Sequence, residues 1–210
     1  MSDPRRVAIL GGTFDPIHLG HIAIAEQAVD GAGLEETWLV PSATPPHRGA
    51  ASASAQDRLD MVQSAVAGHP RLRVLDIEVR RPGPSYTADT LRELEAGYPG
   101  AEFWIVLGAD AARDIVTWHG REELLGRARF LLVNRSGVDR LAEADARRLG
   151  FDAGGRTLII EVDSPAISAT EVRERVAAGL SLDGLVPAAV AEIIAARGLY
   201  ASEGAGGLVG

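Results

Sequence analysis

The sequence of 210 residues contains no cysteine and no lysine. Without cysteine, the chain forms no disulfide, has no thiolate nucleophile and binds neither zinc nor an iron–sulfur cluster through sulfur. Without lysine, it cannot contain a Walker-type P-loop. Any phosphate group must therefore be bound by arginine, histidine, backbone N–H groups or a metal ion.

Long apolar runs are also missing. No stretch approaches the ~20 residues of a membrane span, and the apolar run near the N-terminus is too short for a signal peptide, so we expect a cytoplasmic protein without a membrane contact. The formal net charge is −8, from 21 basic and 29 acidic residues. An acidic chain repels a nucleic-acid backbone, so we expect no nucleic-acid partner, whereas a small phosphorylated ligand needs only a local positive site.

The composition, with 46% apolar and 24% charged residues, is ordinary for a folded globular protein. The length favours one domain, which we place over residues 1–200, followed by a flexible glycine-rich tail at 201–210. Residues 43–55 are rich in proline, alanine and serine, which predicts a mobile loop. Whether this loop closes over a substrate stays open.

Apolar runs alternate with segments of helical periodicity. The predicted strands cover Val7–Leu10, Thr37–Val40, Leu72–Val79, Phe103–Leu107, Phe130–Val133 and Leu158–Val162. The predicted helices lie near Ile22–Val29, Leu59–Val66, Thr87–Leu94, Ser168–Ala178 and Pro187–Arg197. This alternation predicts an α/β fold, a Rossmann-like doubly wound parallel sheet with helices on both faces and a C-terminal helical segment. Ligands of such sheets bind beyond the carboxyl ends of the strands.

The first predicted strand continues into the string GGTFDPIHLGH, residues 11–21. Its two leading glycines let a ligand approach the backbone closely, and the following helix directs free N–H groups and its positive end to the same place. His18 and His21 are spaced to share one helix face, and Gly20 leaves that face uncrowded. The string is not the dinucleotide fingerprint, and two histidines without a third ligand make a poor zinc site. Taken alone, it also fits a tight turn with two surface histidines.

A second string, SPAISATEVR at residues 164–173, precedes a predicted helix. Ser168 and Glu171 have the spacing of a capping box, so by itself this string indicates only a well-capped helix.

Both strings resemble signatures of the nucleotidylyltransferase superfamily. The first is similar to the T/HxGH signature, in which two histidines and backbone N–H groups hold the phosphates of a nucleoside triphosphate. The second is similar to the signature Ile-Ser-x-Thr-x-x-Arg, which binds the β- and γ-phosphates. The resemblance implies catalytic roles for His18, His21 and Arg173. It implies ATP contacts for Gly11, Gly12, Thr13, Phe14, Gly108, Asp110, Ile167, Ser168 and Thr170.

Three further stretches narrow the resemblance. Residues 85–91 (SYTADTL), residues 108–110 (GAD) and the pair Trp118-His119 resemble bacterial nicotinate-nucleotide adenylyltransferases, a similarity that extends over residues 7–200. In that family the nicotinate ring lies against a tryptophan, and backbone N–H groups and a threonine meet its carboxylate. The implied substrate-binding residues are Ser85, Tyr86, Thr87, Trp118, His47 and Arg48.

Three positions depart from the family pattern. Arg48 replaces a loop lysine, which keeps the charge but changes the geometry. Gly120 stands near a common second tryptophan, and Gly184 stands where an aromatic residue usually precedes Leu-Val-Pro. These departures affect the shape of the nicotinate pocket and leave the phosphate signatures intact.

The resemblance implies transfer of AMP from ATP to nicotinate mononucleotide, giving deamido-NAD and pyrophosphate in NAD biosynthesis. It implies direct in-line attack without a covalent enzyme intermediate, with Mg²⁺ carried on the phosphates and no metal ligand from a protein side chain. Alternatives stay open: nicotinamide mononucleotide as a sole or additional acceptor, phosphopantetheine as acceptor, or a non-catalytic nucleotide sensor. A Rossmann dehydrogenase is disfavoured because the glycine fingerprint is missing. The oligomeric state is left open.

Overall fold

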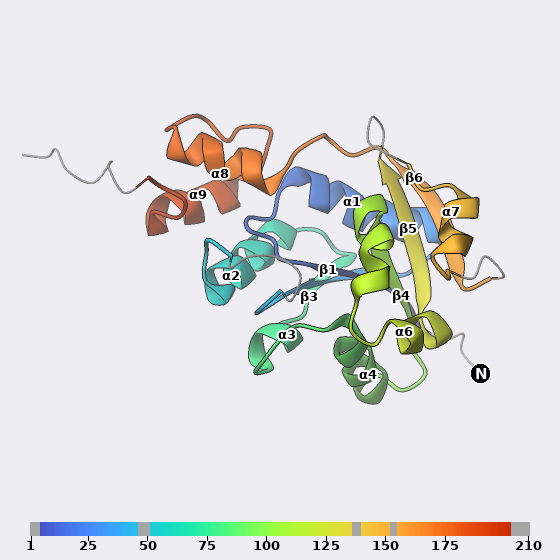
Figure 1. Cartoon of the computed structure of the whole chain (residues 1–210). Coiled ribbons are helices and arrows are strands. Elements are labelled where there is room, and N and C mark those ends of the chain that lie inside the picture. Colours follow the sequence, from blue (N-terminus) through green and yellow to red (C-terminus); the bar gives the residue numbers. More distant parts are fainter. Residues whose placement is uncertain (1–4, 46–50, 136–139, 152–154, 203–210) are drawn as a thin grey trace, which may run out of the picture.

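The apolar runs of the sequence become the strands of a parallel sheet. The computed structural model describes residues 5–45, 51–135, 140–151 and 155–202. Within them the strands are β1 (Arg6–Gly12), β2 (Glu36–Pro41), β3 (Leu72–Val74), β4 (Glu102–Gly108), β5 (Arg129–Arg135) and β6 (Thr157–Val162). Their order in the six-stranded sheet is β3-β2-β1-β4-β5-β6, and all neighbours pair in parallel (Figure 1).

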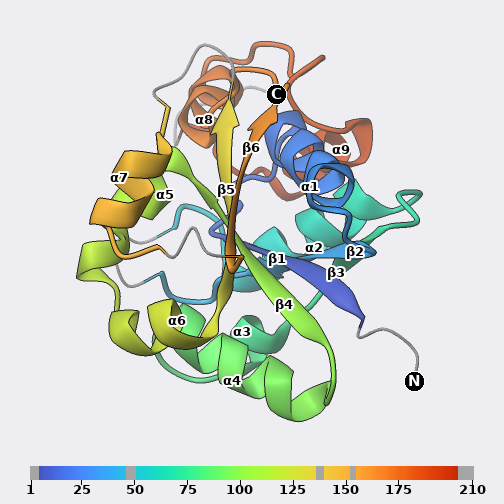
Figure 2. The same cartoon turned by 90° about the vertical axis from the view of Figure 1, so that its right-hand side faces the viewer.

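Helices cover both faces of this sheet, because strand side chains point alternately to two separate cores. In β4, Trp104 and Val106 join one core, whereas Phe103, Ile105 and Leu107 join the other. The first core packs against α1 (Leu19–Ala32), α2 (Ala55–Val66), α8 (Ala169–Ala177) and α9 (Ala188–Arg197). The second packs against α3 (Ile77–Arg80), α4 (Thr87–Gly97), α5 (Ala109–Arg113), the 3₁₀ helix η1 (Asp114–Thr117), α6 (Arg121–Arg127) and α7 (Glu143–Arg148). Figure 2 shows α1 and α9 on one side of the sheet and α4 and α6 on the other.

The predicted Rossmann-like α/β class is confirmed. The strand order reverses between β1 and β4, which lie side by side although they are distant in the sequence. In sheets of this order, ligands bind in the crevice where the order reverses, beyond the carboxyl ends of the strands. Gly12 and Gly108 end these two strands, so both lie at the edge where a ligand is expected. None of the described helices is long and apolar enough to span a bilayer.

One predicted strand is wrong in its second half. We predict a strand over 72–79, but β3 ends at Val74 and the chain then forms α3. β3 is an edge strand, and a short apolar run does not by itself distinguish strand from helix. Asp76 lies just before α3, and the turn directs Glu78 inward, where its carboxylate accepts a 2.6 Å hydrogen bond from the Thr90 hydroxyl. The sequence patterns also missed the short elements α3, α5, η1, α6 and α7.

Candidate active site

The loop after β1 folds tightly around its glycines. A Cβ atom added at Gly12 would lie 2.9 Å from the ring of Phe14, so only glycine leaves room for that ring. Phe14 is buried and has a left-handed backbone with φ of 49°. Its ring meets that of His21 edge-on, with the centroids 5.1 Å apart. The loop therefore fixes the position of a histidine that lies seven residues further along the chain.

The two histidines of the first string lie together, as the spacing predicts. Their rings are stacked with centroids 3.7 Å apart, and the backbone N–H of His18 donates to Nδ1 of His21 over 3.3 Å. His18 has an extended backbone and caps α1 rather than belonging to it. A Cβ at Gly20 would lie 3.0 Å from Nδ1 of His18 and 3.2 Å from the carbonyl oxygen of Pro165. The expectation that Gly20 prevents crowding is confirmed.

His18 is only 5% exposed, and this burial controls the charge of its ring. Burial, together with the positive charge of Arg135 at the end of β5, lowers its pKa from the usual 6.5 to about 4. The ring is therefore neutral at pH 7 and offers one N–H donor and one acceptor. Its Nδ1 atom is buried and has no hydrogen-bond partner among the described residues. A buried ring nitrogen without a hydrogen-bond partner is uncommon in folded proteins.

The second string meets the first across the fold. Ser168 caps α8, because its Oγ accepts the backbone N–H of Glu171 over 3.1 Å, as predicted. Arg173 donates from Nη1 to the backbone carbonyl of Asp15 over 2.7 Å and from Nη2 to Oγ1 of Thr170 over 3.2 Å. Asp15 and Arg173 are 158 residues apart in the sequence. The structure thus brings the arginine of one signature onto the loop of the other.

The predicted residues after β4 lie at the same sheet edge. Gly108 caps α5, which begins directly where β4 ends. The Asp110 side chain is largely exposed and lies 3.7 Å from the guanidinium of Arg113. Because β1 and β4 are parallel neighbours, both loops open at the carboxyl edge.

The predicted acceptor residues that the structure describes lie before α4, in its first turn and in the Trp118-His119 segment. The rings of Tyr86 and His119 stack with centroids 4.3 Å apart, which brings the segment before α4 next to the Trp118-His119 pair. Gly120 has a left-handed φ of 70°, and a Cβ there would lie 2.8 Å from Cβ of Ala88. Glycine at this position therefore lets the loop lie against the first turn of α4. The ring of Trp118 packs partly against the core on this face.

Some predicted positions have a simpler explanation or are not described. Gly184 has a left-handed φ of 73°, a turn conformation that favours glycine over an aromatic residue. His47 and Arg48, predicted to bind substrate, lie outside the described residues, as do the predicted tail residues beyond Ser202.

Comparison with known proteins places this geometry in a family. Residues 9–175 match the family described as cytidylyltransferase-like. The chain belongs to this family. It is 40% identical to the "Probable nicotinate-nucleotide adenylyltransferase" of Shouchella clausii, covering 93% of this chain and 97% of that one. It is 41% identical to the protein of the same name from Saccharopolyspora erythraea, covering 97% and 93%.

Solved structures agree on the fold of this cytidylyltransferase-like chain. The Plasmodium falciparum nicotinic acid mononucleotide adenylyltransferase complexed with NaAD superposes with a TM-score of 0.78 at 20% identity, covering 93% of this chain and 97% of that chain. The same enzyme complexed with APC gives a TM-score of 0.76. The shared architecture supports the fold described for this chain.

Two buried charged residues of the cytidylyltransferase-like chain escaped the sequence patterns. Arg58 on α2 is 1% exposed, and among the described residues its guanidinium donates only to backbone carbonyl oxygens. The carboxylate of Asp15 accepts the N–H groups of Ser52 and Ala53 over 2.7 and 3.1 Å and the hydroxyl of Tyr200 over 2.8 Å. Burial and the carboxylate of Asp15 raise the pKa of Tyr200 well above its usual value, so the phenol stays protonated as a donor.

A signal for one of them exists in the sequence. Arg58 shares the spacing i, i+3, i+4, i+7 with Met61, Val62 and Ala65, so a charge stands on the core-facing stripe of a helix. No comparable signal marks Asp15 as a partner of Tyr200, because the two are distant in sequence.

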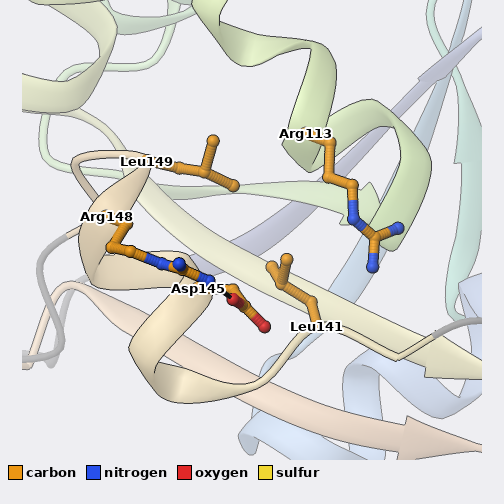
Figure 3. A pocket seen from close by; sticks show the side chains of 5 residues that line it. All are labelled: Arg113, Leu141, Asp145, Arg148 and Leu149. Carbon is orange, nitrogen blue, oxygen red and sulfur yellow. Dashed lines mark hydrogen bonds and ion pairs between the residues drawn. The ribbon is translucent and has the colours of Figure 1, made fainter.

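A hollow also lies beside the last residue of α5. It has a volume of about 220 Å³ and lies between α5 and α7, lined by Arg113, Leu141, Asp145, Arg148 and Leu149 (Figure 3). Arg148 is paired with Asp145, so part of the charge is compensated within the hollow. None of the residues predicted to bind substrate lines it. Within the described parts of the chain, no three His, Asp or Glu side chains gather as a metal site would require.

Proposed function

We propose that this protein transfers AMP from ATP to nicotinate mononucleotide, releasing pyrophosphate and forming deamido-NAD in the biosynthesis of pyridine nucleotides. The observation that carries this proposal is the contact of Arg173 with the backbone of Asp15, which joins the two phosphate signatures at the carboxyl edge of the sheet. The identity of about 40% with relatives named as nicotinate-nucleotide adenylyltransferases supports the same reaction. ATP as co-substrate favours a cytoplasmic location.

The chemistry requires no nucleophilic side chain. An oxygen of the acceptor phosphate, already an anion near neutral pH, attacks the α-phosphorus of ATP in line with the leaving group. A new P–O bond forms, and the bond from the α-phosphorus to the bridging oxygen breaks, so that pyrophosphate leaves with that electron pair. A general base is unnecessary because no proton has to be removed. The protein contributes alignment of two anions and neutralisation of their charge.

The residues at the end of β1 are assigned to the donor phosphates. His18 and His21 contact the α- and β-phosphates, assisted by the backbone N–H groups of Gly12 and Thr13. The neutral His18 ring donates a hydrogen bond without the cost of a buried charge. The β- and γ-phosphates contact a group that combines hydroxyls, a helix N-terminus and a guanidinium: Ser168, Thr170 and Arg173. The remaining proposed ATP contacts are Gly11, Phe14, Gly108, Asp110 and Ile167.

Magnesium fits this site as a companion of ATP. The groups gathered here are N–H, hydroxyl, imidazole and guanidinium donors, which suit phosphate oxygens, whereas Mg²⁺ prefers oxygen ligands and keeps several waters. The phosphates rather than protein side chains would hold the ion. When bound, it would neutralise charge on the phosphate oxygens and on the leaving pyrophosphate.

The acceptor is assigned to the group around α4. Tyr86, Thr87 and Trp118, with the neighbouring Ser85, would bind the nicotinate nucleotide, the loop residue His47 would contact it, and Arg48 would add positive charge. The stacked pair of Tyr86 and His119 provides an aromatic surface beside Trp118.

The test offers ATP and Mg²⁺ with nicotinate mononucleotide, nicotinamide mononucleotide or phosphopantetheine separately, and reads pyrophosphate release and product mass. We expect dominant turnover of the nicotinate nucleotide. His18→Ala should lower kcat by at least about 100-fold. His69→Ala is the matched control, since His69 pairs at the surface with Glu26 and should leave kcat unchanged. Comparable turnover of the amide would refute acid selectivity, and no pyrophosphate from any acceptor would refute the reaction.

A further inference from the structure

Arg58 is a buried cation whose hydrogen bonds, in the part of the chain that the structure describes, all go to the backbone of loops. It donates to the carbonyl oxygens of Thr13 (2.6 Å), Ser42 (2.7 Å), Ala43 (3.0 Å) and Ala53 (3.3 Å). Burial lowers the pKa of its guanidinium, and the carboxylate of Asp15 partly offsets this effect. Burying a cation is costly, and an apolar side chain of similar volume often serves stability as well. The placement of Arg58 therefore calls for a reason beyond filling the core.

The four carbonyls belong to the loops that the proposed function assigns to the two substrates. Thr13 lies in the phosphate loop after β1. Ser42 and Ala43 begin the loop after β2, and Ala53 ends it just before α2. We call residues 42–45 and 51–54 the acceptor loop, because Ala43 and Thr44 hydrogen-bond to Ser85, a proposed acceptor contact. The planar guanidinium, with five N–H donors in a fixed fork, binds the donor loop and both ends of the acceptor loop at once.

The acceptor loop is in turn tied to α4. The backbone N–H of Ala43 donates to Oγ of Ser85 over 3.0 Å, and the N–H of Ser85 donates to the carbonyl of Thr44 over 3.0 Å. Ala43 is thus held by its carbonyl to Arg58 and by its N–H to Ser85. A continuous set of hydrogen bonds runs from Thr13 through Arg58 and Ala43 to the segment before α4.

We propose that Arg58 is a positioning residue that fixes the phosphate loop relative to the acceptor loop, and thereby the in-line alignment of the two substrates. This inference rests on the proposed function. Arg58 acts through the loops that it holds, because its hydrogen bonds within the described part of the chain go to backbone carbonyls. Loss of alignment affects the step that needs both substrates and leaves the binding of ATP alone nearly unchanged.

The expected fall in kcat follows from the geometry of group transfer. A misplacement of about 1 Å costs roughly 100-fold in rate. Arg58→Met keeps a side chain of similar length but removes every donor, so kcat should fall about 100-fold. The Kd for ATP alone should change less than about 3-fold. Arg58→Lys keeps the charge, but a compact ammonium cannot meet four carbonyls, so kcat should recover by less than about 10-fold.

Met61→Ala is the matched control for lost stability. Met61 is fully buried on the same helix and belongs to the core rather than to the loop contacts. This change should lower Tm by roughly 5–15 °C while leaving kcat within about 2-fold of the wild type at temperatures well below Tm.

The experiment measures Tm, kcat, both KM values and the ATP Kd by calorimetry for the wild type and the three variants. Wild-type turnover establishes the proposed function first, so a defect confined to the variants concerns Arg58 alone. A fall in kcat at nearly constant ATP Kd in both Arg58 variants, absent from Met61→Ala, supports the proposal. Arg58 variants that lose Tm but keep wild-type kcat overturn it. If Arg58→Met does not fold, the same comparison is made with Arg58→Lys.

Discussion

Replacing Gly20 by alanine separates the stability of α1 from the position of His18. Glycine inside a helix usually costs about 0.5–1 kcal/mol relative to alanine, so Gly20→Ala should stabilise the chain if the new methyl group had room. It has little. The added Cβ would lie 3.0 Å from Nδ1 and 3.1 Å from Cε1 of His18, and 3.2 Å from the carbonyl oxygen of Pro165.

The imidazole is the neighbour that has to move. The Pro165 carbonyl accepts the N–H of Ile167 over 2.8 Å, which holds that side of the contact. Moving the ring of His18 disturbs its stack on His21 and its alignment with a phosphate. The helix gain and the contact cost oppose each other, so the free energy of unfolding should stay within about 1 kcal/mol of the wild type. The displaced ring should lower kcat by roughly 10- to 100-fold.

The control is Gly126→Ala on α6, where an added Cβ meets nothing within 4 Å. It should raise the free energy of unfolding by about 0.5–1 kcal/mol and leave kcat unchanged. Urea unfolding and initial rates of pyrophosphate release measure both quantities. On a His18→Ala background, Gly20→Ala should cause no further loss of kcat, since the displaced group is already gone. Wild-type kcat in Gly20→Ala, or a full additional loss on that background, would refute the reasoning.

Three further outcomes follow from buried groups. The pKa of His18 lies near 4 in the folded chain and 6.5 in the unfolded chain, so only the unfolded chain takes up this proton between these values. Stability is therefore lost as the pH falls from 6.5 to 4, by about 3 kcal/mol, and urea unfolding should show this slope reduced in His18→Asn. Glu78→Gln weakens the hydrogen bond from the Thr90 hydroxyl, so the free energy of unfolding should fall by about 1–2 kcal/mol. Because Thr90 lies on α4, beside the proposed acceptor contacts, KM should rise more for the acceptor than for ATP. Trp104→Phe removes the 2.8 Å indole bond to Glu102 near the amino end of β4, so it should lower stability by about 1–2 kcal/mol in the same assay and leave kcat unchanged.

The features that could be predicted from the sequence are those with local signals. Continuous apolar runs mark strands that are buried on both faces, and they locate most of β1 and β4. The spacing of His18 and His21 places the two rings together, and Ser168 with Glu171 predicts the cap of α8. Each of these depends on residues a few positions apart.

The contacts between distant segments could not be predicted in this way. Arg58 bonds to carbonyl oxygens, which every residue possesses, so no side-chain pattern identifies its partners. The strand order decides which loops surround Arg58, because β2 lies beside β1 and the loops after both strands meet. The turn after Val74 has the same origin, since Glu78 turns inward to meet Thr90 on another helix.

Asp15 and Arg58 together explain how a loop of small residues can be held in place. The segment from Ala51 to Ser54 has only methyl and hydroxymethyl side chains, which make few contacts of their own. Its backbone N–H groups at Ser52 and Ala53 are accepted by the Asp15 carboxylate, and the Ala53 carbonyl is bound by Arg58. Opposite buried charges thus satisfy opposite backbone groups, and each offsets part of the cost of burying the other. Because Asp15 also receives Arg173 at its backbone oxygen, the groups that hold the acceptor loop also hold the phosphate site. The relative position of the two substrate loops therefore depends on buried side chains outside the acceptor loop.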